Sequence, residues 1–183
     1  MLNYLLKRLY YRLRSDFPTE YLIKKGLVVG ENFSRMHGTI LDPSHCWLIH
    51  IGNNVTLAPR VHILAHDAST CKIFGYARIG DVVIGNNVFV GADSVVLPNT
   101  KIGDNSIIGA NSTVTRDIPA NVVAAGSPAK VICSLDEYIE TNRMMMQNRP
   151  CYGDEFTARN KSLTKEMKIQ MFTELHDGFG YVK

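Results

Sequence analysis

The sequence predicts an all-β solenoid, a parallel β-helix in which each short strand contributes one aliphatic side chain to a shared core. The first observation is an aliphatic residue every six positions, at Ile84, Val90, Val96, Ile102, Ile108 and Val114. The second is a small or β-branched residue four positions later, at Val88, Ser94, Thr100, Ser106, Ser112 and Ile118. Repeats of six residues are typical of parallel β-helices. An amphipathic α-helix is excluded, because its period is about 3.6 residues.

The geometry of such a repeat is a three-sided prism. Three repeats, or 18 residues, complete one turn with one strand on each face. The turns are expected to stack at the usual strand spacing of about 4.8 Å. A glycine follows the aliphatic residue at Gly85, Gly91, Gly103 and Gly109. We expect these glycines to take backbone angles at the corners that a β-carbon would forbid.

The composition is that of a globular protein. The chain has 183 residues, of which 45% are hydrophobic and 20% charged, and this length predicts one domain with a substantial core. A net charge of +3 is too small to indicate nucleic-acid binding. The apolar N-terminal stretch contains Lys7 and Arg8, which argues against a signal peptide. The four cysteines show neither metal-ligand nor disulfide spacing, so we expect a cytoplasmic protein.

The N-terminal region, residues 1–28, is predicted to be a helical cap. Leucines at positions 2, 5, 6, 9 and 13 share one helical face, and Lys7, Arg8, Arg12 and Arg14 surround it. One interpretation is weak peripheral contact of residues 1–16 with an anionic membrane surface. The other is a helix that covers the first coil or packs on a neighbouring subunit. A short second helix is expected to end at Gly26.

Residues 29–132 are predicted to form the β-helix, with two interruptions. Asp42-Pro43-Ser44 is a turn signal, so a small loop is expected there. The phase of the repeat fails between Ile63 and Ile84, which are 21 residues apart. A loop over 66–80 is therefore expected, and loops that leave a rigid scaffold often carry function.

Residues 133–183 are predicted to form a helical extension. Helices are expected over 134–148 and 162–176, with a loop over 149–160. Open ends of a solenoid expose unpaired strand edges, so we expect terminal helices to cover them.

The motifs carry a resemblance. The stretches I-G-x-N-V-x-V-G-A and I-G-x-N-S-x-I-G-A, with A-A-G-S-P-A-K-V-I at 124–132, resemble the hexapeptide-repeat acyltransferases, above all the maltose/galactoside-type and capsular-polysaccharide O-acetyltransferases. The resemblance implies a left-handed coil and a homotrimer. It also implies acetyl transfer from acetyl-CoA, without a required metal, to a saccharide hydroxyl of a cell-surface or capsular glycan.

The resemblance places the chemistry at the break in the repeat. In I-G-N-N-V-T-L-A-P-R-V-H-I-L-A-H-D, His66 matches the general base of the family, and imidazole suits that role. Asp67 either orients this imidazole or caps the loop. Asp42 matches an acceptor-binding aspartate. We found no Ser or Cys nucleophile with a base at recognisable spacing, so direct transfer is the simplest mechanism.

Other residues are candidates for binding the two substrates. The acceptor site is expected to include His37, His45 and Trp47, although Trp47 fits a buried strand equally well. Small corner residues, Ala92 and Ala110, match positions that contact the pantetheine arm of CoA. Thr115 matches a residue near the adenine, and Lys130 matches one that faces the 3′-phosphate. Arg116 is a candidate for a second basic residue, where the family pattern has one and this chain has Cys133. Small side chains would also fit these corners without CoA.

Other functions stay open at this point. An amino-sugar N-acetyltransferase and a serine acetyltransferase-like enzyme are the runners-up in the same class. A different class is a trimer like the zinc-dependent γ-carbonic anhydrases, with ligands drawn from His45, His50, His62 and His66. A non-catalytic scaffold would keep only the fold.

Overall fold

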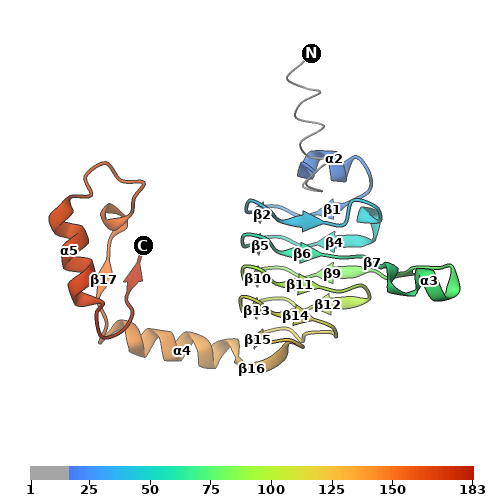
Figure 1. The fold of residues 1–183 in the computed structure, drawn as a ribbon. Helices are drawn as coiled ribbons and strands as arrows, with labels where there is room; N and C mark the ends of the chain where they lie inside the picture. The colour runs from blue at the N-terminus through green and yellow to red at the C-terminus, as the bar shows by residue number, and fades with distance from the viewer. Residues whose placement is uncertain (1–16) are drawn as a thin grey trace, which may run out of the picture. The chain divides into compact units, whose positions relative to one another are not determined.

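The computed structural model describes residues 17–183, which form two compact units divided after Leu135. The first unit is a prism of short parallel strands (Figure 1). The second unit runs from Asp136 to Lys183. The predicted amphipathic helix over 2–14, and any membrane contact through 1–16, lie outside the described residues.

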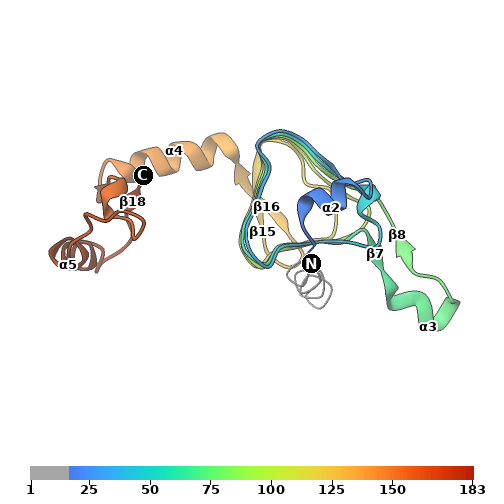
Figure 2. The same ribbon diagram turned by 90° about the horizontal axis from the view of Figure 1, so that it is seen from above.

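The prism has three faces, which are seen end-on in Figure 2. The first face contains β1 (Val28–Val29), β4 (Ile49–Ile51), β9 (Val82–Ile84) and β12 (Thr100–Ile102). The second contains β2 (Ser34–Arg35), β5 (Thr56–Leu57), β10 (Phe89–Val90), β13 (Ile107–Ile108), β15 (Val122–Ala125) and β16 (Lys130–Ser134). The third contains β3 (Ile40–Leu41), β6 (His62–Ile63), β11 (Val95–Val96) and β14 (Thr113–Val114). Within these three faces, every strand pair is parallel except β15–β16, so the predicted parallel β-helix is confirmed.

The core contains the side chains that the six-residue period selects. All six aliphatic positions from Ile84 to Val114 are at most 1% exposed, and the small or β-branched positions between them are also buried. The buried serine and threonine hydroxyls find carbonyl partners nearby, as a buried polar group requires. Ser94 Oγ, for example, donates to Gly109 O at 3.0 Å in the next coil. The core is therefore a stack of aliphatic layers with hydrogen-bonded small residues between them.

The expectation for the repeat glycines was wrong. In the repeats, the residues with positive φ are asparagines, with one aspartate and one arginine, and they include Asn87 (φ 54°) and Asn105 (φ 55°). Gly91 does not have a positive φ. Gly91 is required by space instead, since a Cβ there would lie 2.4 Å from Ala110 N in the next coil. Asparagine tolerates the left-handed region better than most residues. At the corners, the asparagine position therefore adopts the positive φ, and the glycine position allows the next coil to approach closely.

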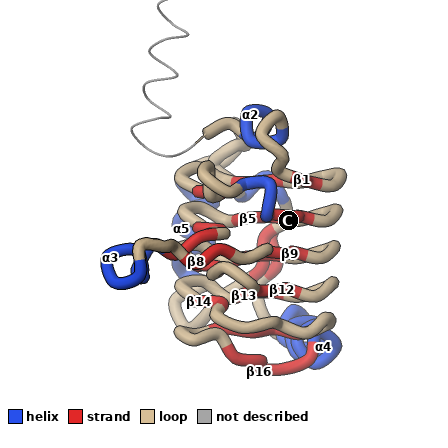
Figure 3. Tube along the Cα trace, turned by 90° about the vertical axis from the view of Figure 1, so that its right-hand side faces the viewer, coloured by secondary structure: helices blue, strands red, loops and turns tan. Residues whose placement is uncertain are grey.

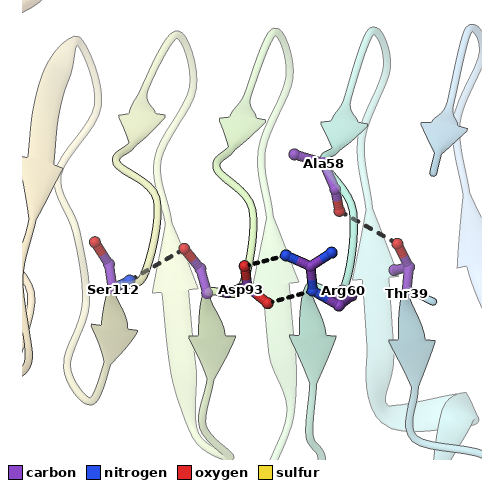
Figure 4. A network of polar contacts seen from close by, with 6 residues as sticks. Thr39, Ala58, Arg60, Asp93 and Ser112 are labelled. Carbon is purple, nitrogen blue, oxygen red and sulfur yellow. Dashed lines mark hydrogen bonds and ion pairs between the residues drawn. The ribbon is translucent and has the colours of Figure 1, made fainter. Parts of the chain in front are cut away.

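Polar ladders run along the corners of the prism. The Asn54 amide donates to Asn87 at 2.9 Å, Asn87 donates to Asn105 at 2.8 Å, and Asn105 donates to Asn121 at 2.9 Å. At another corner, the Arg60 guanidinium makes two hydrogen bonds to the Asp93 carboxylate (Figure 4). These ladders fix the register of successive coils.

Two insertions interrupt the prism. The first ends in a 3-10 helix, η1 (Cys46–Leu48), where the turn signal at Asp42 predicted a loop. The second is an arm that projects from one corner (Figures 2 and 3), built from β7 (His66–Asp67), η2 (Ala68–Thr70), α3 (Cys71–Phe74) and β8 (Arg78–Ile79). Strands β7 and β8 pair antiparallel. Asn87 and its partner Asn105 are 18 residues apart, whereas Asn54 and Asn87 are 33 apart across the arm, which confirms the predicted break in phase.

The ends of the chain differ from each other. Helix α2 (Thr19–Ile23) inserts the fully buried Leu22 into the core next to the first coil. The second unit contains α4 (Leu135–Met146, which begins at the boundary), β17 (Cys151–Tyr152), η3 (Asp154–Phe156), α5 (Lys165–Glu174) and β18 (Tyr181–Val182). Residues 149–160 were predicted to be a loop, but they contain β17, which pairs parallel with β18. Covering of the prism by the C-terminal helices stays a prediction. No helix among residues 17–183 is long and apolar enough to cross a membrane.

Replacing Asn105 separates the two contributions of the asparagine ladder. Asn105→Gly keeps the positive φ at no steric cost but loses the side-chain hydrogen bonds, so we expect the free energy of unfolding to fall by about 1 kcal/mol. Asn105→Ala also strains the backbone, and its loss should be about 2 kcal/mol. Denaturant unfolding followed by circular dichroism measures both. Equal losses in the two variants would contradict a backbone role for this position.

Candidate active site

The centre of the site is the carboxylate of Asp42, which is 1% exposed. Leu41 of β3 points into the core, and the chain turns at the Asp-Pro-Ser sequence directly after it. The Oδ1 atom accepts from the backbone N–H groups of Ser44 at 2.9 Å and His45 at 3.3 Å. The Oδ2 atom accepts from Ala65 N–H at 3.1 Å and contacts the Nδ1 atom of His66. The buried carboxylate is therefore hydrogen-bonded on both oxygens, as burial requires.

The imidazole of His66 stands where the arm leaves the prism. Ala65, just before it, is fully buried, and the His66 side chain is 33% exposed. A carboxylate offers only acceptor sites, so the Nδ1 atom of His66 is the donor in its bond to Asp42. In the neutral ring the Nε2 atom then has no proton and is free to accept one. A partly exposed imidazole with one nitrogen fixed by a buried carboxylate is suited to general-base catalysis.

His45 and Trp47 lie beside this pair. The ring centroids of His45 and His66 are 5.1 Å apart, and those of His45 and Trp47 are 5.3 Å apart. Cys46, between His45 and Trp47, is fully buried, and its Sγ lies 3.6 Å from Leu22 O. Cys46 therefore anchors η1 to the core. Burial raises the pKa of the Cys46 thiol. Trp47 is 51% exposed in η1, so the interpretation of Trp47 as a buried strand residue was wrong.

Asp67 holds the arm and not the imidazole. Its carboxylate accepts from Ser69 N–H at 2.9 Å and pairs with the Arg78 guanidinium on β8. These contacts, with Arg78 the larger, lower the pKa of Asp67 to about 2. Of the two roles expected for Asp67, the structure thus places its side chain in the loop-capping one, while Asp42 occupies the orienting position. His37 lies in the turn between β2 and β3, where its carbonyl accepts from Arg60 N–H.

The residues expected to bind CoA are divided between two corners of the prism. Ala92 and Ala110 occupy the same corner in successive coils, between the second and third faces. Lys130, exposed at the start of β16, pairs with Ala125 at this same corner. Thr115 and Arg116 are exposed after β14, at the other end of the third face. His66 follows β6 at that end as well. Within one chain, His66 and the Ala92 corner are therefore separated by the whole width of a face.

The pairing of Asp42 with His66 was missed by the sequence analysis, although a signal for it exists. Leu41 pairs with Ile63, because the insertion before β4 lengthens this coil to 22 residues. Asp42 N–H accordingly donates to Ile63 O at 2.9 Å, which brings the aspartate beside Ala65 and His66. If the insertion is included when β3 is aligned with β6, Leu41 falls opposite Ile63, and Asp42 is then expected near His66.

Metal-ligating side chains also converge here. Asp42, His45 and His66 each offer one ligand atom, and these atoms lie within 4.8 Å of one another. His50 on β4 and His62 on β6 are not part of this cluster. The alternative of a zinc site shared between subunits, with three ligands drawn from His45, His50, His62 and His66, is a different arrangement from this cluster, and one chain does not test it.

Comparison with known proteins gives consistent matches. The family model "Bacterial transferase hexapeptide (six repeats)" matches residues 81–116. Galactoside O-acetyltransferase of Escherichia coli K12 is 38% identical over 127 residues, which cover 66% of this chain and 60% of the relative. Protein CapG of Staphylococcus aureus is 38% identical over 141 residues, which cover 73% of this chain and 81% of the relative.

A solved structure decides the family. A maltose O-acetyltransferase from Clostridium difficile 630 is 33% identical, with a TM-score of 0.57 over 69% of this chain and 83% of that chain. The chain belongs to the hexapeptide-repeat acetyltransferase family. The coil of this family is the left-handed β-helix, as the resemblance implied. The match nevertheless spans only 60% of the length of the Escherichia coli relative, so membership alone does not define the activity of this hexapeptide-repeat acetyltransferase.

The capping role of Asp67 can be tested by proteolysis of the arm. Asp67→Asn weakens the pairing with Arg78, so local opening of the arm should become more frequent. We expect trypsin to cleave after Lys72 roughly several-fold faster than in the wild type. Asp93→Asn, which weakens the similar pair with Arg60 on the prism, is the matched control and should leave that rate unchanged. An arm cleaved equally fast in wild type and Asp67→Asn would refute the anchoring role.

Proposed function

We propose that this protein transfers an acetyl group from acetyl-CoA to a hydroxyl group of a saccharide, with His66 as the general base. The observation that carries the proposal is the contact between the buried Asp42 carboxylate and the partly exposed His66 imidazole, at the base of a projecting arm. A base held in this way needs only an acceptor hydroxyl and an acyl donor.

The proposed reaction is a direct transfer. The Nε2 atom of His66 takes the proton of the acceptor hydroxyl while the oxygen forms a bond to the acetyl carbonyl carbon. Asp42 keeps the Nδ1–H in place and stabilises the imidazolium that forms. The protonated ring then returns its proton to the departing thiolate, so that the acetyl ester and free thiol are the products. Acetyl-CoA supplies the acetyl group as an activated thioester.

The corner with Ala92 and Ala110 supports a binding site for the donor. Both side chains are methyl groups, and Gly91 lets the backbone of this coil approach Ala110 closely. Such a corner leaves room for an extended pantetheine arm along the edge of the prism. Lys130 pairs with Ala125 at the end of β15 and so lies at this corner, where it supplies positive charge suited to phosphate groups. Arg116 follows β14 at the other end of the third face and is not at this corner within one chain.

The distance between these two sites supports a homotrimer. Because His66 and Ala92 lie at opposite ends of the third face, one chain alone does not bring the base to this edge. Three prisms packed side by side would place the His66 corner of one subunit against the Ala92 corner of its neighbour. The acceptor would then bind between them.

A saccharide acceptor is supported by the relatives and by Trp47. The galactoside and maltose O-acetyltransferases are named for saccharide acceptors. Trp47 is half-exposed and lies beside His45, whose ring contacts that of His66. An exposed indole next to a catalytic pair is a suitable platform for a sugar ring. We propose that η1 contributes this platform to the acceptor site.

The reaction can be tested by thiol release from acetyl-CoA in the presence of sugars, nucleotide sugars, amino sugars or serine. We expect release with a hydroxyl-bearing saccharide and an O-acetylated product by mass spectrometry. His66→Ala should lower the rate roughly 10²- to 10⁴-fold, because it removes the general base, while CoA binding persists.

His176→Ala is the matched control, because it removes an exposed imidazole from the second unit. This variant should keep the wild-type rate. Unchanged thiol release in His66→Ala would refute the mechanism. Transfer only to amino sugars or to serine would refute the proposed acceptor.

A further inference from the structure

We propose that Asp42, His45 and His66 form a binding site for a divalent transition metal of the zinc class, and that metal binding switches off the base. The site lies within one chain and uses ligands from two segments, the insertion that contains η1 and the start of the arm. The inhibitory consequence rests on the proposed function, whereas the metal site itself does not.

The donor set fits such a cation. Two imidazoles and one carboxylate are ligands that zinc and its first-row neighbours bind well. Ligand atoms in a tetrahedral zinc site are about 3.4 Å apart, given bonds of about 2.1 Å. The three candidate atoms already lie within 4.8 Å of one another, so small side-chain rotations are enough to close the site. Three protein ligands would leave a fourth position for water.

The free nitrogen of His45 is the second observation. Its Nδ1 atom is buried and has no hydrogen-bond partner among the described residues. A buried unpaired polar atom is costly, and native proteins usually satisfy it. The ring is not placed there by chance packing, because the His45 N–H binds Asp42 and the adjacent Cys46 is locked into the core. A metal ion would give this nitrogen a partner.

The surroundings of Asp42 also suit a metal ligand. Three backbone N–H groups bond to its oxygens and fix the carboxylate. Such hydrogen bonds orient a ligating group and are typical of metal sites. His66 is shared between the two functions, since a ring bound to a metal cannot stay in its catalytic hydrogen bond and also accept a proton. Occupancy of the site and catalysis therefore exclude each other.

Cobalt titration of the full-length protein without an affinity tag tests the site directly. Co²⁺ bound by this donor set should give visible absorption bands with a stoichiometry of one per chain, and Zn²⁺ should displace it. His45→Gln removes one ligand and should weaken binding at least about tenfold. His176→Gln is the matched control and should bind as the wild type does. Co²⁺ binding that survives in His45→Gln, or no binding in the wild type, would overturn the proposal.

Two further readouts keep the test decisive. If His45→Gln does not fold, protection of the wild type answers the question: Zn²⁺ should slow carbethoxylation of His45 and His66 but not of His176, as located by mass spectrometry. Equal modification at all three would refute the site. Where acetyl transfer is observed, Zn²⁺ should lower the wild-type rate by a larger fraction than the rate of His45→Gln, each compared with its own zinc-free rate, and equal fractional inhibition of both would refute the switch. Absent acetyl transfer would refute the proposed function and leave the cobalt result standing.

Discussion

The burial of one carboxylate governs the arrangement of the site. Asp42 has lost nearly all contact with solvent, and an ionised group in that position is tolerated only if hydrogen bonds replace the lost water. Its partners come from the turn after β3 and from the segment where the arm begins. The same contacts that satisfy the carboxylate therefore hold two insertions together and fix the ring of His66. Asp42 thus has a structural role in the fold besides the role proposed for it in catalysis.

The contact between Asp42 and His66 depends on the regularity of the prism outside its two insertions. Successive coils repeat the inward aliphatic layer, and polar contacts such as Asn87–Asn105 join their corners. The candidate acid–base pair, Asp42 and His66, lies at the two places where the repeat is interrupted. Both interruptions follow the third face, one after β3 and one after β6, and these strands are neighbours in the sheet. The insertions consequently meet at one corner, although 24 residues separate Asp42 from His66.

Periodicity alone predicted much of this fold. The aliphatic period identified the buried residues from Ile84 to Val114, and the failure of the phase located the arm. The role of the repeat glycines was misjudged, because the close approach between coils joins residues far apart in sequence, such as Gly91 and Ala110, and local propensity does not report such a contact. The pair β17–β18 was missed for a similar reason, since it joins residues 30 positions apart and, unlike the strands of the prism, belongs to no repeat. In the site, His66 was found by its place at the break, while its partner depended on the register of an irregular coil.

The most direct test of the account is the tautomer of His66, measured from the ¹⁵N chemical shifts of its imidazole in protein labelled with [¹⁵N]histidine. His66→Ala provides the assignment. The account predicts that the neutral ring carries its proton on Nδ1, bonded to Asp42, with Nε2 unprotonated and ready to accept a proton. A neutral ring with its proton on Nε2 would contradict the contact on which the proposed catalysis depends.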